Sequence, residues 1–172
     1  MEILSGFMFT LAFIKFGLTI EFLIAAVLIT SLIISAFIDL KYQVIPDKVV
    51  LPTFIMGLLL NILINKENIL YHLMGFALGG GTIFLIVVLS RGGMGGGDIK
   101  LFAAVGIFLG FRLTALALLL SFILGSFAGI VLVLLKRKKI NDAIPFGPFI
   151  ALASVISLFV GEKILAWYLG LF

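Results

Sequence analysis

The chain has 172 residues and a mass of 18.6 kDa; 63% of its residues are hydrophobic and only 12% are charged. A soluble domain of this length would need many more polar residues to cover its surface. The composition, with a mean hydropathy of +1.38, therefore excludes an ordinary soluble domain and predicts a protein that crosses the membrane several times. The net charge of +4 is spread between apolar segments, which fits membrane topology better than a nucleic-acid surface.

Polar, glycine and proline residues divide the chain into seven apolar segments. In chain order they are 3–16, 21–38, 49–64, 69–90, 99–110, 113–135 and 147–171. Each should form a helix, because an open strand leaves backbone groups unpaired in lipid. We therefore predict an all-α polytopic membrane protein with about seven membrane helices in a single domain, 1–172. The fifth segment is too short for a full span, so we expect it to be partly re-entrant or shielded from lipid by its neighbours.

The distribution of Lys and Arg predicts the orientation of these segments. Basic residues accumulate on the cytoplasmic side of membrane proteins. Eight of them lie in or beside the loops that follow segments two, four and six, and four lie on the opposite side. We therefore expect the first side, together with the N-terminus, to face the cytoplasm. The first group is Lys41, Lys48, Arg91, Lys100, Lys136, Arg137, Lys138 and Lys139, and the second is Lys15, Lys66, Arg112 and Lys163.

Several common catalytic motifs are missing. The sequence has no Cys and a single His, His72, and it contains neither His-Glu-x-x-His nor Gly-x-Ser-x-Gly. Thiol nucleophiles, Cys-ligated zinc and the usual zinc and serine hydrolase motifs are therefore excluded. We predict no metal and no cofactor, and we expect His72, beside Tyr71, to be a helix-start or interfacial residue.

Carboxylates are the remaining candidates for catalysis. Asp39 follows a predominantly apolar run without any charged residue, 22–38, at a depth where an unpaired carboxylate is costly. Asp98 follows a stretch with five glycines in six residues, 92–97. A helix N-cap would explain Asp98 but not the glycines, which let a backbone approach a substrate closely. Two carboxylates that share one proton can activate water against a peptide bond, so carboxylates are the expected catalytic groups if the protein is a protease.

Five short sequences stand in a characteristic order along nearly the whole chain. They are Phe37-Ile38-Asp39, Ile45-Pro46-Asp47, Leu51-Pro52, Gly95-Gly96-Gly97-Asp98-Ile99-Lys100-Leu101 and Ile144-Pro145-Phe146-Gly147-Pro148-Phe149. This series resembles the bacterial type IV prepilin peptidases, which are aspartic proteases of the GxGD class. The resemblance implies an endopeptidase of the bacterial inner membrane that removes the short leader of type IV prepilins or pseudopilins, of pilus or type II secretion systems, at the cytoplasmic face.

Carried over position by position, the resemblance implies that Asp39 and Asp98 are the catalytic pair. It also implies a catalytic loop that contains Gly95 and Gly97. The partners it implies are a prepilin or pseudopilin and membrane lipid, without nucleic acid.

Two further residues of the series have roles other than direct catalysis. Asp47 is expected to be the N-cap of the third segment rather than a catalytic residue, with tuning of the carboxylate pair or contact with the substrate as the alternative. Lys100 is expected either to tune the carboxylate pair, to bind an acidic group of the substrate, or to serve only membrane topology.

The chain departs from the family pattern in one respect. Many members carry a cytoplasmic domain with paired Cys-x-x-Cys motifs, associated with methylation of the new N-terminus. This chain has no Cys and begins at Glu2-Ile3-Leu4, close to where such members resume after that domain. We therefore expect a naturally short or a trimmed peptidase without N-methyltransferase activity.

Three other functions stay open at the level of sequence. The same acidic residues would serve a small proton-coupled or cation-coupled transporter. A non-enzymatic scaffold of a secretion apparatus would need no acidic pair. A GxGD-class relative with another substrate is the third alternative.

Overall fold

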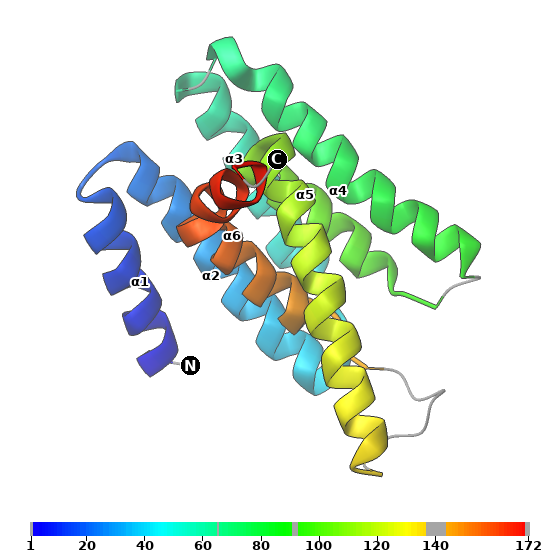
Figure 1. Ribbon diagram of the computed structural model, residues 1–172. Coiled ribbons are helices and arrows are strands. Elements are labelled where there is room, and N and C mark those ends of the chain that lie inside the picture. Colours follow the sequence, from blue (N-terminus) through cyan, green and yellow to red (C-terminus); the bar gives the residue numbers. More distant parts are fainter. Residues whose placement is uncertain (1, 65, 91–92, 137–143, 171–172) are drawn as a thin grey trace.

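The computed structural model describes residues 2–64, 66–90, 93–136 and 144–170, and within these ranges it contains helices and no strand (Figure 1). The all-α prediction is therefore confirmed. The elements in chain order are α1 (Glu2–Phe16), α2 (Ile20–Tyr42), α3 (Asp47–Ile64), the 3-10 helix η1 (Lys66–Asn68), α4 (Ile69–Leu89), α5 (Gly96–Leu134) and α6 (Gly147–Leu169).

Five of the described helices, α2 to α6, are long and apolar enough to cross a membrane. The prediction of a multi-pass membrane protein is thus confirmed, but the count of seven spans is not. The helix α1 has 15 residues, fewer than the roughly 20 that cross a bilayer. The predicted segments 99–110 and 113–135 are joined in α5, which has 39 residues.

The helix α5 changes direction at Gly110, where the backbone leaves helical geometry with φ 70° and ψ 179°. In Figure 1 the first part of α5 runs beside α4, and the second part, coloured yellow, returns toward the opposite end of the molecule. A Cβ atom at this position would collide with the ring of Tyr71, and a positive φ also favours glycine. The sequence boundary between 110 and 113 therefore corresponds to a real turn, although both sides of it belong to one helical element.

Side chains of α3 and α4 bind the backbone beside this turn. The amide Nδ2 of Asn61 donates to the carbonyl oxygen of Ile107 at 3.0 Å, and Nδ1 of His72 lies 2.8 Å from the same oxygen. Since a carbonyl oxygen only accepts, Nδ1 must carry the proton in this bond. The hydroxyl of Tyr71 accepts from the N–H of Arg112 at 3.0 Å. His72 therefore makes a structural contact in the first turn of α4.

The first part of α5 is enclosed by protein. Every residue from 101 to 110 is buried, which confirms the expectation that this short segment is shielded from lipid. Glycines of α4 make the close approach possible. A Cβ at Gly75 would collide with the backbone of Gly106, and one at Gly79 would press on the carbonyl of Phe102. This buried part of α5 carries Asp98 at its start.

Candidate active site

One cavity of about 660 Å³ lies where the end of α2, the start and middle of α5 and the residues before α6 meet. Residues from three connections that are far apart in sequence share it, as expected if the connections after α2, α4 and α5 lie on one side of the membrane. Its lining consists of Asp39, Gln43, Val44, Ile45, Gly93, Met94, Gly95, Gly96, Gly97, Asp98, Phe122, Gly125, Ser126, Ile144, Pro145 and Phe146.

Asp39 lies in the last turn of α2 and is only 5% exposed. Its Oδ2 accepts a hydrogen bond of 2.7 Å from the backbone N–H of Gly147, the first residue of α6. A Cβ atom on Gly147 would lie 2.8 Å from that oxygen and 3.0 Å from the Cβ of Asp39. Glycine is therefore required for α6 to approach the carboxylate this closely.

Asp98 lies at the start of α5 and is 7% exposed. Its Oδ2 accepts from the N–H of Gly95 at 3.1 Å, and its own N–H donates to the carbonyl of Gly95 at 3.1 Å. Gly95 is the N-cap and Asp98 is the third helical residue, so the Asp98 carboxylate satisfies the N–H of the N-cap, whereas the bond in the other direction goes to the backbone carbonyl because glycine has no side chain. The simple N-cap interpretation of Asp98 is therefore wrong by three positions, because the helix begins within the glycines.

Gly97 brings the start of α5 against the connection between α2 and α3. A Cβ atom at Gly97 would lie 2.8 Å from the Cβ of Ile45, so a larger residue would push the two segments apart. The glycine-rich sequence thus has two distinct tasks, because Gly95 caps the helix and Gly97 permits close packing.

The two candidate carboxylates come together although 59 positions separate Asp39 from Asp98. Both line the same cavity, and Asp39 is close enough to Asp98 to interact with it electrostatically. Among the described residues, neither forms an ion pair with a Lys or Arg. Two neighbouring carboxylates with little access to water favour a state in which they hold one proton between them.

Lys100 and Asp47 form an ion pair outside the cavity. The Nζ of Lys100 lies 2.8 Å from each carboxylate oxygen of Asp47, and the two side chains are 56% and 64% exposed. Asp47 is the first residue of α3, and the carbonyl of Pro46 accepts from the N–H groups of Val49 and Val50. Asp47 therefore lies one position inside the N-cap at which it was expected.

Gly147 is the residue of the site to which sequence reasoning assigned no role. Its sequence, Pro145-Phe146-Gly147-Pro148, was noticed as part of a series, but nothing in it indicates a hydrogen bond to Asp39. The sequence shows only a glycine directly before Pro148, which allows a close approach of backbone but does not identify the partner.

Residues 26–130, which include Asp39 and Asp98, match the family described as the Type IV leader peptidase family. The chain is 34% identical over 169 residues to the prepilin leader peptidase/N-methyltransferase of Bacillus subtilis (strain 168), a match that covers 98% of this chain and 68% of that protein. Proteins of the same name from Legionella pneumophila and Aeromonas hydrophila are 35% and 37% identical, with 90% and 85% of this chain covered. No solved structure matches the chain.

The fold and the cavity define a multi-pass helical membrane protein with a pair of carboxylates in one pocket. The chain belongs to the type IV leader peptidase family, a family of peptidases. It spans 56% and 52% of the length of the Legionella and Aeromonas proteins.

Proposed function

We propose that the chain, as one membrane domain over 1–172, is an aspartic endopeptidase that removes the leader of type IV prepilins or pseudopilins. The observation that carries the proposal is that Asp39 and Asp98, both nearly buried, line one cavity. The names of the relatives, prepilin leader peptidase/N-methyltransferase, support this class of substrate.

In the proposed mechanism one carboxylate is ionised and the other is protonated. The ionised carboxylate takes a proton from a water molecule, and the water oxygen attacks the carbonyl carbon of the scissile peptide. The protonated carboxyl group meanwhile donates a hydrogen bond to the carbonyl oxygen. Breaking of the C–N bond, with a proton transferred to the leaving nitrogen, completes hydrolysis. The N–H groups of Gly147 and Gly95 hold Asp39 and Asp98 in place during these steps.

The cavity is proposed to open toward the cytoplasm from the bacterial inner membrane. The connections that line it follow α2, α4 and α5, the sequence regions with the larger number of Lys and Arg residues. A prepilin whose leader lies in the cytoplasm would reach the carboxylates from that side.

The proposal is tested by cleavage of a prepilin with the purified chain in lipid. Asp39→Asn and Asp98→Asn keep the side-chain shape and remove the charge, so each is expected to reduce cleavage to background. Asp47→Asn is the matched control, since Asp47 is 64% exposed and does not line the cavity. Cleavage that persists in either cavity variant would exclude the aspartic mechanism.

The chain is also proposed to lack N-methyltransferase activity, although its relatives carry both names. The support is the absence of Cys from the sequence. Incubation of the purified chain with prepilin and S-adenosylmethionine should give an unmethylated product by mass spectrometry. A methylated N-terminus on the mature product would contradict the proposal.

A further inference from the structure

A second hollow, of about 460 Å³, lies between α1, α2 and α3, and α2 and α3 are both long and apolar enough to cross a membrane. Its lining comes from α2 over 26–34 and from α3 over 48–56, with Phe9 of α1 at one side. We call it the α2–α3 groove. Its described lining shares no residue with that of the cavity that holds Asp39 and Asp98, so the groove is a separate feature of the fold.

The groove lies on the face of α2 opposite the carboxylate. Thr30 lines the groove, and Asp39 lies nine residues further along the same helix. Because an α-helix has about 3.6 residues per turn, nine residues make about two and a half turns, and the two side chains point in opposite directions. A peptide in the groove would have α2 between itself and Asp39, which argues against the substrate as the occupant.

The surface of the groove suits a hydrocarbon chain. Most of its described lining residues are apolar, and all but one are uncharged. The hydroxyls of Thr30 and Thr53 each donate to a carbonyl oxygen four residues earlier in their own helix, at 2.7 Å. These two donors are therefore already satisfied, and a chain of methylene groups can pack against them without leaving either one unpaired.

Lys48 places a positive charge at one end of the groove. It is the only charged residue among the described lining residues, and it is exposed. As the second residue of α3 it lies at the mouth, whereas Met56 lies two turns deeper along the helix. The neighbouring carboxylate, Asp47, is paired with Lys100, and among the described residues Lys48 forms no ion pair. Its ammonium group is therefore available to an anion, and the positive end of the α3 dipole adds to the attraction.

We propose that the α2–α3 groove binds one anionic phospholipid, with an acyl chain along the groove and the headgroup phosphate at Lys48. The occupant must combine a hydrocarbon chain with an anion at one end, and the surrounding bilayer supplies such molecules. Phosphatidylglycerol meets both requirements, whereas phosphatidylethanolamine has no net charge. The bound chain would contact Phe9 as well as α2 and α3, and so help to hold α1 against the other helices. Binding of this lipid does not require the peptidase activity proposed above.

The test is native mass spectrometry of the purified chain in detergent, with equal amounts of phosphatidylglycerol and phosphatidylethanolamine that carry the same acyl chains. For the wild-type chain we expect one retained lipid, with phosphatidylglycerol favoured about fivefold, the effect typical of one Lys near a membrane surface. Lys48→Gln should bring the ratio of the two lipids close to one, because the acyl chain still binds but the charge is gone.

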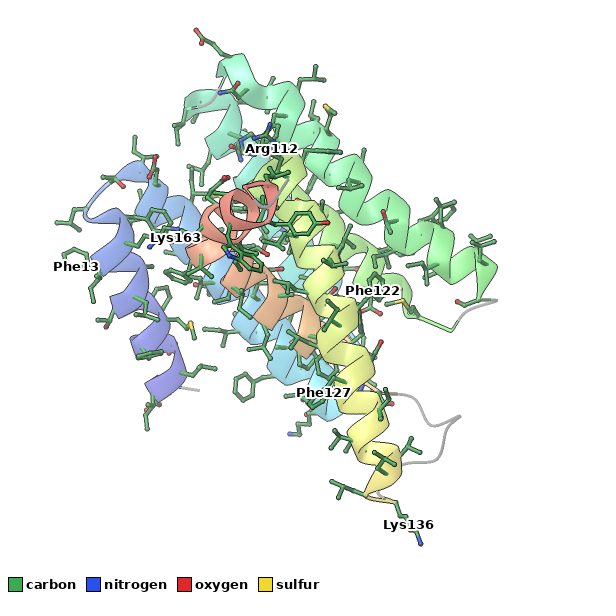
Figure 2. The ribbon with its side chains drawn as sticks, viewed as in Figure 1. Phe13, Arg112, Phe122, Phe127, Lys136 and Lys163 are labelled. Carbon is green, nitrogen blue, oxygen red and sulfur yellow. The ribbon has the colours of Figure 1, made fainter. Side chains whose placement is uncertain are left out.

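Two other lysines serve as controls for the loss of charge. Lys41 is exposed, lies in the last turn of α2 and lines neither the groove nor the cavity. Lys136 lies at the end of α5, apart from the helices that form the groove (Figure 2). Lys41→Gln and Lys136→Gln should both retain the wild-type ratio. An equal fall in all three variants would show a general attraction of anionic lipid and overturn the site.

A second pair of variants tests the position of the acyl chain. Thr30 is exposed at the groove, so the indole of Thr30→Trp should fill it and abolish retention of both lipids. Ile55→Trp is the matched control, since Ile55 is 46% exposed on α3 and does not line the groove. It should retain lipid as the wild type does. Circular dichroism shows whether each variant keeps its helices, and the comparison of Lys48→Gln with Lys41→Gln stands without the Trp variants.

The outcomes that contradict the proposal are specific. A wild-type chain that retains no lipid, or a Lys48→Gln variant with the wild-type ratio, would overturn the site. If Thr30→Trp keeps its lipid but loses cleavage of prepilin, the groove serves the substrate and the lipid proposal is wrong.

Discussion

The backbone N–H of Gly147 donates a hydrogen bond of 2.7 Å to Oδ2 of Asp39, although 108 positions separate the two residues. Through this bond the start of α6 holds the carboxylate at the end of α2. A candidate catalytic residue is thus oriented by a group with no titratable side chain, which ties the geometry of the cavity to the packing of α2 against α6.

This bond predicts that Gly147→Ala lowers cleavage without unfolding the protein. The added Cβ would lie 2.8 Å from Oδ2 of Asp39, so the carboxylate or α6 must move. A displacement of about 1 Å at a catalytic group can reduce the rate roughly a hundredfold, and we expect a fall in kcat of that order. Gly81→Ala is the control, because nothing lies within 4 Å of its added Cβ. Equal kcat values for the two variants would contradict the positioning role.

The ion pair between Lys100 and Asp47 leads to a second prediction. Both side chains are more than half exposed, so Lys100→Met and Asp47→Asn should each destabilise the protein by only about 0.2–1 kcal/mol. Cleavage should fall by a few-fold at most, and the double variant should be no worse than either single variant. The measurements are thermal unfolding and kcat/KM in the same lipid. A much larger loss of cleavage for Lys100→Met than for Asp47→Asn would instead indicate a contact of Lys100 with the substrate or the carboxylate pair.

Sequence reasoning selected carboxylates at positions where the neighbouring residues do not suit a charged side chain. Asp39 ends an apolar run and Asp98 follows a run of glycines, so each is visible as a local conflict between residue type and environment. The structure brings both into one cavity. The hydrogen bond from Gly147 depends on how α6 packs on α2, and a backbone N–H leaves no trace in residue type.

The helix boundaries illustrate a similar limit. All seven predicted segments begin or end within three residues of a described helix end, because the polar residues that end an apolar run also lie at the ends of the helices. The sequence predicted a boundary near Gly110 but not the backbone conformation of the turn there. It requires the ring of Tyr71 on α4 to occupy the space of a side chain, and that contact joins segments about 40 residues apart.

The conformation of Gly110 predicts that Gly110→Ala destabilises the fold. A residue with a side chain at φ 70° costs about 1–3 kcal/mol in backbone strain, and its Cβ would also displace the ring of Tyr71. The variant should show a lower thermal unfolding temperature. Gly6→Ala is the matched control, because its added Cβ meets no atom within 4 Å and alanine favours a helix. An unfolding temperature for Gly110→Ala equal to or above that of Gly6→Ala would contradict this account.

The proposed carboxylate pair predicts a rate that falls at both low and high pH. Catalysis needs one ionised and one protonated carboxyl group, so it is lost when both are protonated and again when both are ionised. The profile of kcat/KM against pH should therefore have an acid limb and an alkaline limb. Asp47→Asn should retain the same profile, since Asp47 does not line the cavity. A rate that rises to a plateau and does not fall again would be evidence against a protonated partner.

The orientation is open to direct measurement because the sequence contains no Cys. A single introduced thiol is then the only site that reacts with a maleimide. Ser90 and Asn68 adjoin the two ends of α4, and both are exposed. If α4 spans the membrane, Ser90→Cys and Asn68→Cys therefore report opposite sides of the membrane. If the connection after α4 faces the cytoplasm, a membrane-impermeant maleimide should label Asn68→Cys in intact spheroplasts. It should label Ser90→Cys only after the membrane is opened.

The same experiment bears on how the substrate reaches the cavity. The loop after Ser90 supplies Gly93 to Gly97 to the cavity lining, so the side on which Ser90→Cys is labelled is the side from which a leader must enter. Each variant should first be shown to cleave prepilin, because a displaced helix could invert the labelling without any change of topology. Labelling of an active Ser90→Cys variant from outside intact spheroplasts would place the carboxylates on the outer side and overturn the cytoplasmic orientation.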